Sequence, residues 1–159
     1  MDLCEGNWSS AIRWETKGGA AVPDADKNKY EDDGKLHVCP YVGTNIRVTY
    51  INKNNLPGKM VEGTCDMAGG DRERFKLTYA RTADDERVWQ YEGYGRVLNG
   101  GAGPGFINGR VTVSAAGGPA GGVRAGVWEA IKLGDHGRAL GTHEPPVGHT
   151  TDSSTKPGP

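Results

Sequence analysis

Hydrophobic and polar residues alternate along most of the chain up to about Leu133, with the period of two that is typical of β-strands. In TNIRVTYIN, Ile46, Val48 and Tyr50 share one face. The polar residues Arg47 and Thr49 share the other face. No long window repeats apolar residues at helical spacing. The pattern predicts an all-β protein with eight strands, at Trp8–Trp14, Lys35–Pro40, Thr44–Asn52, Lys59–Cys65, Arg74–Arg81, Arg87–Leu98, Gly105–Ala115 and Val123–Leu133.

Connectors rich in Gly, Asn, Asp and Pro separate these strands, and only residues 17–34 are long enough for a parallel crossover. We therefore expect antiparallel neighbours in a single β-barrel or closed sandwich, which would leave few exposed strand edges. This domain is predicted to span residues 1–138. Residues 139–159 are rich in Gly, Pro, Ser, Thr and His, so we expect them to form a disordered tail or a linker.

The glycine-rich segment NGGAGPG ends at Gly105 and resembles a phosphate-binding loop only in composition. Such a loop needs a helix directly after its glycines, because the helix N-terminus supplies free N–H groups. Here the next residues alternate, with Val111 and Val113 on the face opposite Arg110 and Thr112. The segment is therefore predicted to connect two strands of a hairpin.

The strand that precedes this segment has one face made of large aromatic residues and glycines. Trp89, Tyr91, Gly93 and Gly95 share this face, where the glycines would leave room for bulky neighbours. The opposite face carries Glu92 among other polar residues. We expect Tyr91 to point into the domain and Glu92 to point outward, beside Arg96 in solvent. If Glu92 pointed inward instead, its desolvated carboxyl would suit proton transfer.

Aromatic residues concentrate in the predicted strands, and packing in the core accounts for most of them. A surplus that faces a cavity, with Glu92, Glu129 or Arg96 as a polar anchor, would form a pocket for a small molecule. The candidate ligand-binding residues are Trp14, Tyr50, Tyr79, Trp89, Tyr91 and Trp128. Glu92 is the candidate catalytic residue.

The triplet Gly6–Trp8, GNW, matches the Gly-x-Trp that opens the first strand of lipocalins. Arg124 in the last strand could pack over Trp8, as a late Arg does in that family. With its eight predicted strands, the chain resembles lipocalin-like (calycin) barrels, and also allene-oxide-cyclase-like barrels, some of which cyclise natural products. The first resemblance implies a ligand-binding cavity. The long acidic first connector and the cysteine pattern depart from lipocalins.

Composition narrows the classes of function. The net charge is −1, with 19 basic and 20 acidic residues, so no basic excess points to nucleic acid or to an anionic membrane. No apolar run approaches a membrane span, and nothing implies a cofactor. The N-terminus lacks a signal-peptide pattern, which favours a cytoplasmic location, or a secreted one if a signal has been removed. The oligomeric state is left open.

Three classes of function remain: binding of a small apolar or aromatic molecule in the barrel, an isomerase or cyclase that uses the same cavity with one acid/base group, and carbohydrate binding by exposed aromatic residues.

A calcium site is a further candidate, because Asp24, Asp26 and Asn28 alternate like the first ligands of a calcium loop. Lys29 stands where such a loop requires Gly, so an exposed acidic loop without metal is the favoured interpretation.

The three cysteines, Cys4, Cys39 and Cys65, allow at most one internal disulfide. They are either reduced, or a bridge joins Cys39 and Cys65, which both lie inside predicted strands. His37 and Cys39 are two residues apart in one strand and so share a face. They could form a Cys–His catalytic pair or bind a metal, although two packed core residues are the favoured interpretation.

Overall fold

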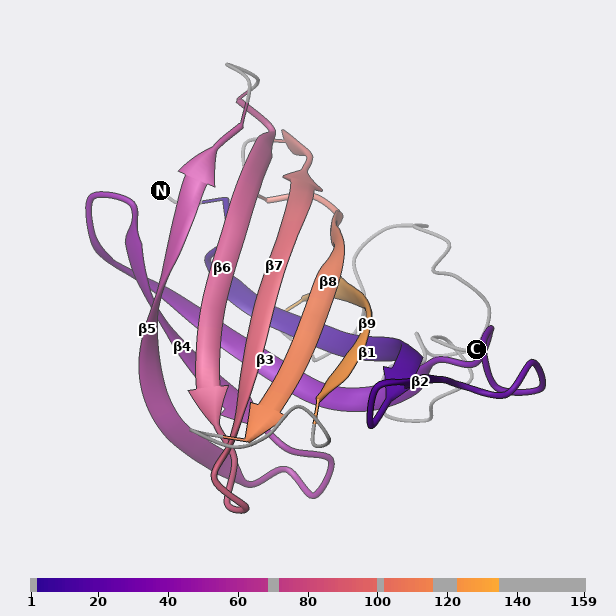
Figure 1. The fold of residues 1–159 in the computed structure, drawn as a ribbon. Helices are drawn as coiled ribbons and strands as arrows, with labels where there is room; N and C mark the ends of the chain where they lie inside the picture. Colours follow the sequence, from indigo (N-terminus) through magenta and orange to yellow (C-terminus); the bar gives the residue numbers. More distant parts are fainter. Residues whose placement is uncertain (1–2, 69–71, 100–101, 116–122, 135–159) are drawn as a thin grey trace.

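The computed structural model describes residues 3–68, 72–99, 102–115 and 123–134, and these form an all-β protein, as predicted (Figure 1). All eight expected strands are present. The short β2 was not expected, and β3 begins at Glu31, inside the segment predicted to be a connector. The predicted tail, residues 139–159, lies outside the described residues. The strands are β1 (Gly6–Lys17), β2 (Ala20–Ala21), β3 (Glu31–Val42), β4 (Asn45–Ile51), β5 (Pro57–Met67), β6 (Arg74–Thr82), β7 (Arg87–Val97), β8 (Gly105–Ala115) and β9 (Arg124–Leu133).

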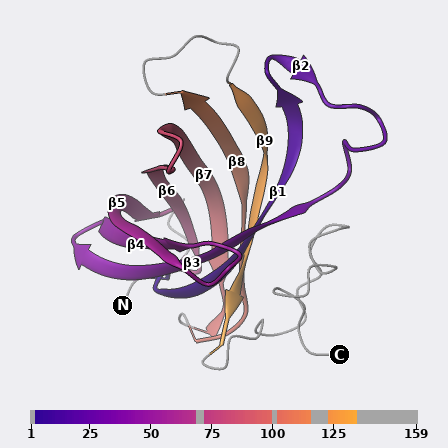
Figure 2. The same ribbon diagram turned by 90° about the horizontal axis from the view of Figure 1, so that it is seen from below.

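The sheet is an antiparallel meander that closes into an eight-stranded barrel. From β3 onward each strand pairs with the next along the chain, and β1 pairs with both β3 and β9. The closing β1–β9 ladder runs from Asn7 opposite Leu133 to Lys17 opposite Arg124, and the two strands lie side by side in Figure 2. The short β2 adds to the end of β1. Closure pairs the edge strands with each other and so removes exposed edges.

The inner face of the barrel carries the core that the alternation predicts. Trp8, Phe75, Tyr91 and Trp128 are among its largest buried side chains. Two of the glycines on this face make room for them. At Gly95, a Cβ atom would overlap the ring of Phe75. Eight strands enclose an interior that side chains can fill, and the buried side chains pack into one core cluster.

The N-terminal segment is tied to one end of the barrel. A disulfide joins Cys4 to Cys65, and the indole N–H of Trp8 donates a hydrogen bond of 2.8 Å to the Cys4 carbonyl. Both alternatives considered for the cysteines, three reduced thiols or a Cys39–Cys65 bridge, are therefore wrong. Cys39 is a free thiol. Cys65 faces the buried interior, whereas Cys39 alternates with the buried Leu36 and Val38 and so faces outward.

Candidate functional site

One end of the barrel, which we call the mouth, carries the candidate site. It is the end where β1, β4, β6 and β8 finish and where β3, β5, β7 and β9 begin. A pocket of about 290 Å³ opens there. This volume is close to the lower limit of about 300 Å³ for small-molecule sites. The lining residues are Ile12, Trp14, Glu31, Asp32, Asp33, Tyr50, Lys53, Arg81, Trp89 and Arg124.

An irregular start of β3 turns Asp33 into this pocket. Ser9 pairs with Lys35 and Ala11 pairs with Asp32, so two residues of β3, Asp33 and Gly34, lie opposite Ser10 alone. This is a β-bulge. Gly34 adopts a φ of 83°, a conformation that favours glycine. The extra residue changes the phase of the alternation, so Asp33 points inward.

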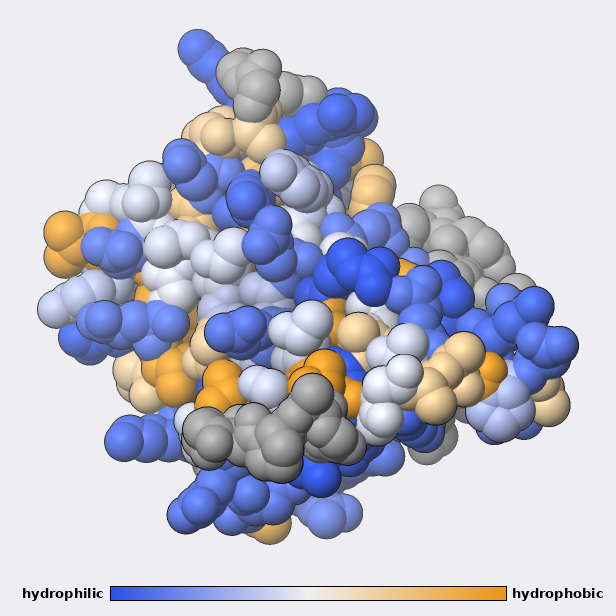
Figure 3. Space-filling view, viewed as in Figure 1, coloured by the Kyte–Doolittle hydropathy of each residue, from blue (hydrophilic) through white to orange (hydrophobic). Residues whose placement is uncertain are grey.

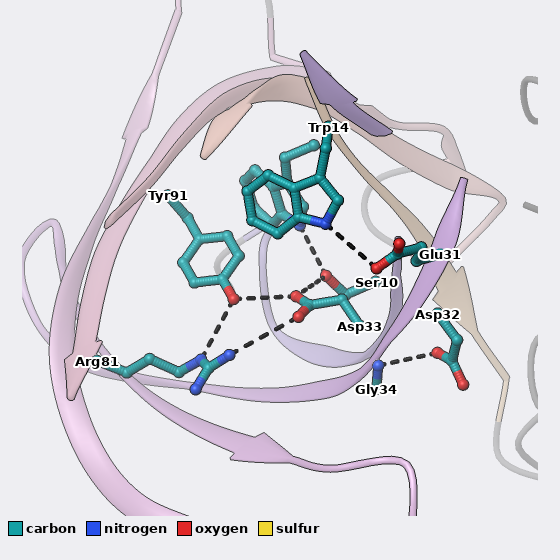
Figure 4. A network of polar contacts seen from close by, with 9 residues as sticks. Ser10, Trp14, Glu31, Asp32, Asp33, Gly34, Arg81 and Tyr91 are labelled. Atoms are coloured by element: carbon teal, nitrogen blue, oxygen red, sulfur yellow. Dashed lines mark hydrogen bonds and ion pairs between the residues drawn. The ribbon is translucent and has the colours of Figure 1, made fainter. Parts of the chain in front are cut away.

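Two chains of hydrogen bonds converge on one oxygen of Asp33 (Figure 4). The Ser10 hydroxyl donates to Asp33 Oδ2 at 2.9 Å, and Ser10 itself accepts a bond of 2.8 Å from Trp128 Nε1. The Tyr91 hydroxyl donates to the same Oδ2 at 3.0 Å and accepts from Arg81 Nε at 3.2 Å. The other oxygen, Asp33 Oδ1, faces Arg81 Nη2 at 3.7 Å, which is longer than a hydrogen bond. This oxygen therefore has room for a further donor.

The environment of Asp33 favours its neutral form more than water does. Burial raises the pKa of Asp33 from 3.8 to about 6, although the charge of Arg81 and the hydrogen bonds from Ser10 and Tyr91 oppose the shift. Burial also raises the pKa of Tyr91, so its hydroxyl stays a donor at neutral pH. A carboxyl group with a pKa near 6 can gain or lose a proton close to neutral pH.

Arg81 is held between aromatic faces beside Asp33. The centre of its guanidinium lies 3.7 Å from the ring centroid of Tyr50 and 4.5 Å from that of Trp89. Its side chain is only 10% exposed. Trp14 packs edge-to-face on Trp89, with ring centroids 5.7 Å apart, and donates a hydrogen bond to Glu31. The mouth thus combines aromatic walls with a fixed cation and a buried acid.

Three of the six predicted ligand-binding residues, Trp14, Tyr50 and Trp89, line the pocket. The side chains of the other three lie deeper in the barrel. Tyr79 stacks on Tyr91 with ring centroids 4.4 Å apart, and both are almost fully buried. Trp128 is fully buried and packs edge-to-face on both tyrosines. These three residues support the floor of the pocket.

The expected orientation of the β7 side chains is confirmed. Tyr91 is 2% exposed and points inward, whereas Glu92 is exposed on the outer face. Glu92 forms an ion pair of 3.2 Å with Lys76, so the expected pair with Arg96 is not the one that the structure contains. The candidate acid Glu92 therefore lies outside the mouth pocket.

The other proposed anchors, Arg96 and Glu129, also lie outside this pocket. Each is next in sequence to an inward residue, Val97 and Trp128 respectively, so both belong to the outer face. Arg124 does not reach Trp8 as the lipocalin resemblance implied. Its guanidinium lies over Trp14 at the mouth, 5.4 Å from the ring centroid.

The sequence pattern did not predict the polar centre of the site, and neither Ser10 nor Arg81 was among the candidate residues. Asp33 fell within residues 17–34, the long segment that was predicted to be a connector. The one available signal was the run EDDG at residues 31–34, in which a glycine follows three acidic residues inside what proves to be a strand. A glycine in a strand is typical of a bulge, and a bulge changes which side chains point inward.

The acidic loop has ion pairs where a calcium site was considered. Asp24 pairs with Lys27 at 3.6 Å, and Asp26 pairs with Lys29 at 3.4 Å. Within the described part of the chain, no three His, Cys, Asp or Glu side chains gather in a way that could hold a metal ion. The same part contains no helix long and apolar enough to cross a membrane.

A larger hollow, of about 760 Å³, lies on the outer face of β5 to β8. Thr64, Thr78, Gln90 and Glu92 line it together with Tyr94, which is 58% exposed. Figure 3 shows this face covered mainly by polar and weakly polar residues. Its one outward aromatic ring offers little surface for stacking on a sugar. The buried acid and the fixed cation make the mouth the stronger candidate.

No known protein indicates the function of this chain, so a functional conclusion rests on the chemistry of the mouth. The likeness to lipocalin-like and allene-oxide-cyclase-like barrels stays a prediction that rests on the strand pattern and one short motif. Searches against family models, curated proteins and solved structures find no match to this chain.

Proposed function

We propose that this protein binds a small aromatic molecule, bearing one hydroxyl or carbonyl group, in the pocket at the mouth of the barrel. The observation that carries the proposal is the position of Arg81, fixed between Tyr50 and Trp89 with the buried Asp33 at its side. Small-molecule sites typically combine apolar walls with a few convergent polar groups. Trp14 and Trp89 supply the walls here.

The polar group of the ligand fits between Asp33 and Arg81. Asp33 Oδ1 and Arg81 Nη2 lie 3.7 Å apart, so an oxygen beside both can donate to the carboxylate and accept from the guanidinium.

Fluorescence titration with 2-naphthol and naphthalene tests the proposal, because these probes differ only in the hydroxyl group. We expect saturable quenching of tryptophan fluorescence by both, with tighter binding of 2-naphthol. The substitution Arg81→Gln should weaken 2-naphthol binding about tenfold and leave naphthalene binding within about twofold, since only the hydroxyl contacts the polar pair. Trp14→Ala should weaken binding of both probes.

The matched control is Glu92→Gln, a change on the outer face that should alter neither affinity. Circular dichroism checks that each variant keeps its strands. The proposal would be excluded if neither probe quenched the fluorescence of the wild-type protein in a saturable way. An equal loss for both probes in Arg81→Gln would exclude the polar anchor.

A second candidate function is proton transfer in the same pocket, as in an isomerase or cyclase. The specific observation is the pKa of Asp33, about 6, at a carboxyl oxygen that has room for a further donor. A base of this kind can remove a proton from the carbon next to a carbonyl group while Arg81 stabilises the charge that develops on the oxygen. Asp33 therefore replaces Glu92 as the candidate acid/base group.

Deuterium exchange at the α-carbon of 2-tetralone, a bicyclic enolisable ketone, tests this second candidate. We expect the wild-type protein to accelerate exchange above the buffer rate and Asp33→Asn to abolish the acceleration. Glu92→Gln should exchange at the wild-type rate. Binding of 2-tetralone without any acceleration would leave the protein a binding module and exclude the enzymatic role.

A further inference from the structure

A second group of reactive side chains lies on the outer face of the barrel, near the end opposite the mouth. Cys39 and His37 point outward from β3, and Asn7 lies directly opposite His37 on β1. The Cys39 sulfur is 3.1 Å from His37 Nε2, and His37 Nδ1 is 2.8 Å from the side-chain oxygen of Asn7. Because the disulfide uses the other two of the three cysteines, Cys39 is the only free thiol of the chain.

The contact with Asn7 sets the tautomer of His37. The amide oxygen of Asn7 is an acceptor, so His37 Nδ1 carries the hydrogen and donates it. His37 Nε2 then has its lone pair directed at the sulfur and can take the proton of the Cys39 thiol. The three residues thus form a nucleophile, a base and a group that orients the base. These roles correspond to those in cysteine nucleophile sites.

Charged side chains lie near the pair on the outer face of the sheet. Arg47 lies opposite Cys39 on β4, with its guanidinium over the ring of Tyr41. Lys35 precedes the pair on β3, and Glu62 lies opposite Arg47 on β5. Glu5 precedes Gly6, which pairs with Val38, so a negative charge lies beside Cys39 on the β1 side. Charges of both signs therefore lie around the pair, and the contacts with His37 and Asn7 carry the activation.

The surroundings select the type of reaction. Acyl transfer would also need free backbone N–H groups beside the sulfur to stabilise an oxyanion. His37 and Cys39 instead lie in a strand that pairs with its neighbours, and paired strands use their amides in the ladder. Exchange with a disulfide needs only an accessible thiolate and a place for the proton.

We propose that Cys39, activated by His37 and Asn7, is a modification site that forms a mixed disulfide with a low-molecular-weight disulfide. His37 Nε2 accepts the proton of the Cys39 thiol, and the thiolate attacks one sulfur of the small disulfide. The Cys39–S–S–R bond forms while the original S–S bond breaks, and the leaving thiolate takes the proton back from His37. The thiol of Cys39 is oxidised to a disulfide, and half of the reagent is reduced to a thiol.

The reaction of the folded protein with 2,2′-dithiodipyridine, which releases a coloured thione, tests this proposal. We expect one equivalent of thione per chain, with the label on Cys39 by mass spectrometry and no release from Cys39→Ser. At pH 6.5 the wild-type rate should exceed that of His37→Gln by at least about tenfold, because an isolated thiol is mostly protonated there. Asn7→Ala should give an intermediate rate, since His37 stays but is no longer oriented.

The pH dependence of the reaction rate distinguishes a Cys39 thiol that His37 activates from one that is only accessible to the reagent. His37→Gln should follow the ionisation of an isolated thiol, near about pH 8.5, whereas the wild-type rate should persist at lower pH. Thr49→Val, a change beside His37 on the outer face of β4, is the matched control and should keep the wild-type profile. Coincident profiles for the wild-type protein and His37→Gln would overturn the proposal, as would an unreactive Cys39 in the wild-type protein.

Discussion

The burial of Asp33 costs free energy of folding, and the same residue supplies a polar group to the proposed site. Its carboxyl group is buried, and it keeps two hydrogen bonds and a nearby cation that offset part of the loss of water. Ser10 and Tyr91 occupy one oxygen, so the other oxygen remains for a ligand. The arrangement concentrates the polarity of the barrel interior at the floor of one small pocket.

The raised pKa of Asp33 predicts a specific pH dependence of stability. The folded protein holds the Asp33 proton with a pKa of about 6, above the ordinary value of 3.8. Its contribution to stability is therefore fully present below about pH 4 and is lost as the pH rises through 6. The shift corresponds to about 3 kcal/mol. We expect the wild-type protein to lose about this amount relative to Asp33→Asn between pH 4 and pH 7.

Urea unfolding of both proteins at several pH values measures this effect. The other carboxyl groups titrate in both proteins, so their contributions largely cancel in the difference between the two free energies of unfolding. A difference that stays constant across this range would contradict the assigned protonation of Asp33.

Among the elements, β3 decides the shape of the site because its bulge brings Asp33 inward. The bulge depends on Gly34, whose φ is 83° and where an added Cβ would meet the backbone of Ile51 at the end of β4. Beyond the bulge, the regular part of β3 places Leu36 and Val38 in the core and His37 and Cys39 on the outer face. One strand therefore contributes to both proposed sites.

We predict that Gly34→Ala lowers the free energy of unfolding by at least about 2 kcal/mol, since it combines an unfavourable φ with a steric clash. The added Cβ would overlap the carbonyl oxygen of Ile51. Gly19→Ala is the matched control, because Gly19 has a φ of 82° and no atom within 4 Å of the added Cβ. It should cost only about 1 kcal/mol. Equal losses in urea unfolding would show that backbone conformation alone, and no steric clash, governs position 34.

At the scale of the whole molecule, two long-range connections hold the barrel closed. The β1–β9 ladder joins the first long strand to the last, and the Cys4–Cys65 disulfide ties the N-terminal segment to β5. The disulfide spans a sequence separation of 61 residues. It therefore restricts the unfolded chain far more than a local link would.

Replacing Cys4 and Cys65 together by Ala should lower the free energy of unfolding by about 4 kcal/mol, the loop-closure value for a loop of this length. Cys39→Ala should change it by less than about 1 kcal/mol, because Cys39 lies outside the core. Urea unfolding of the oxidised wild-type protein and both variants measures the difference. Equal stability of the wild-type protein and the double variant would show that barrel closure rests on the β-ladder alone.

The sequence alone determined the number of long strands, their antiparallel order and the inward orientation of Tyr91. These features are local, because a period of two and the residues of short turns act within a few positions of each other. The same signal correctly placed Glu92 outside the barrel. It also assigned Trp14, Tyr50 and Trp89 to a group of candidate ligand-binding residues, but could not separate them from the aromatic residues of the floor.

Only the tertiary structure decided which polar groups meet. Asp33 contacts Ser10 across 23 residues of sequence and Tyr91 across 58, and Asn7 reaches His37 across 30. These contacts depend on the register between strands and on the bulge at Gly34, which reverses the alternation just where the site forms. The Cys4–Cys65 pairing likewise depends on which face of the sheet each cysteine occupies. Register and closure arise from packing over the whole barrel, so no local pattern of residues encodes them.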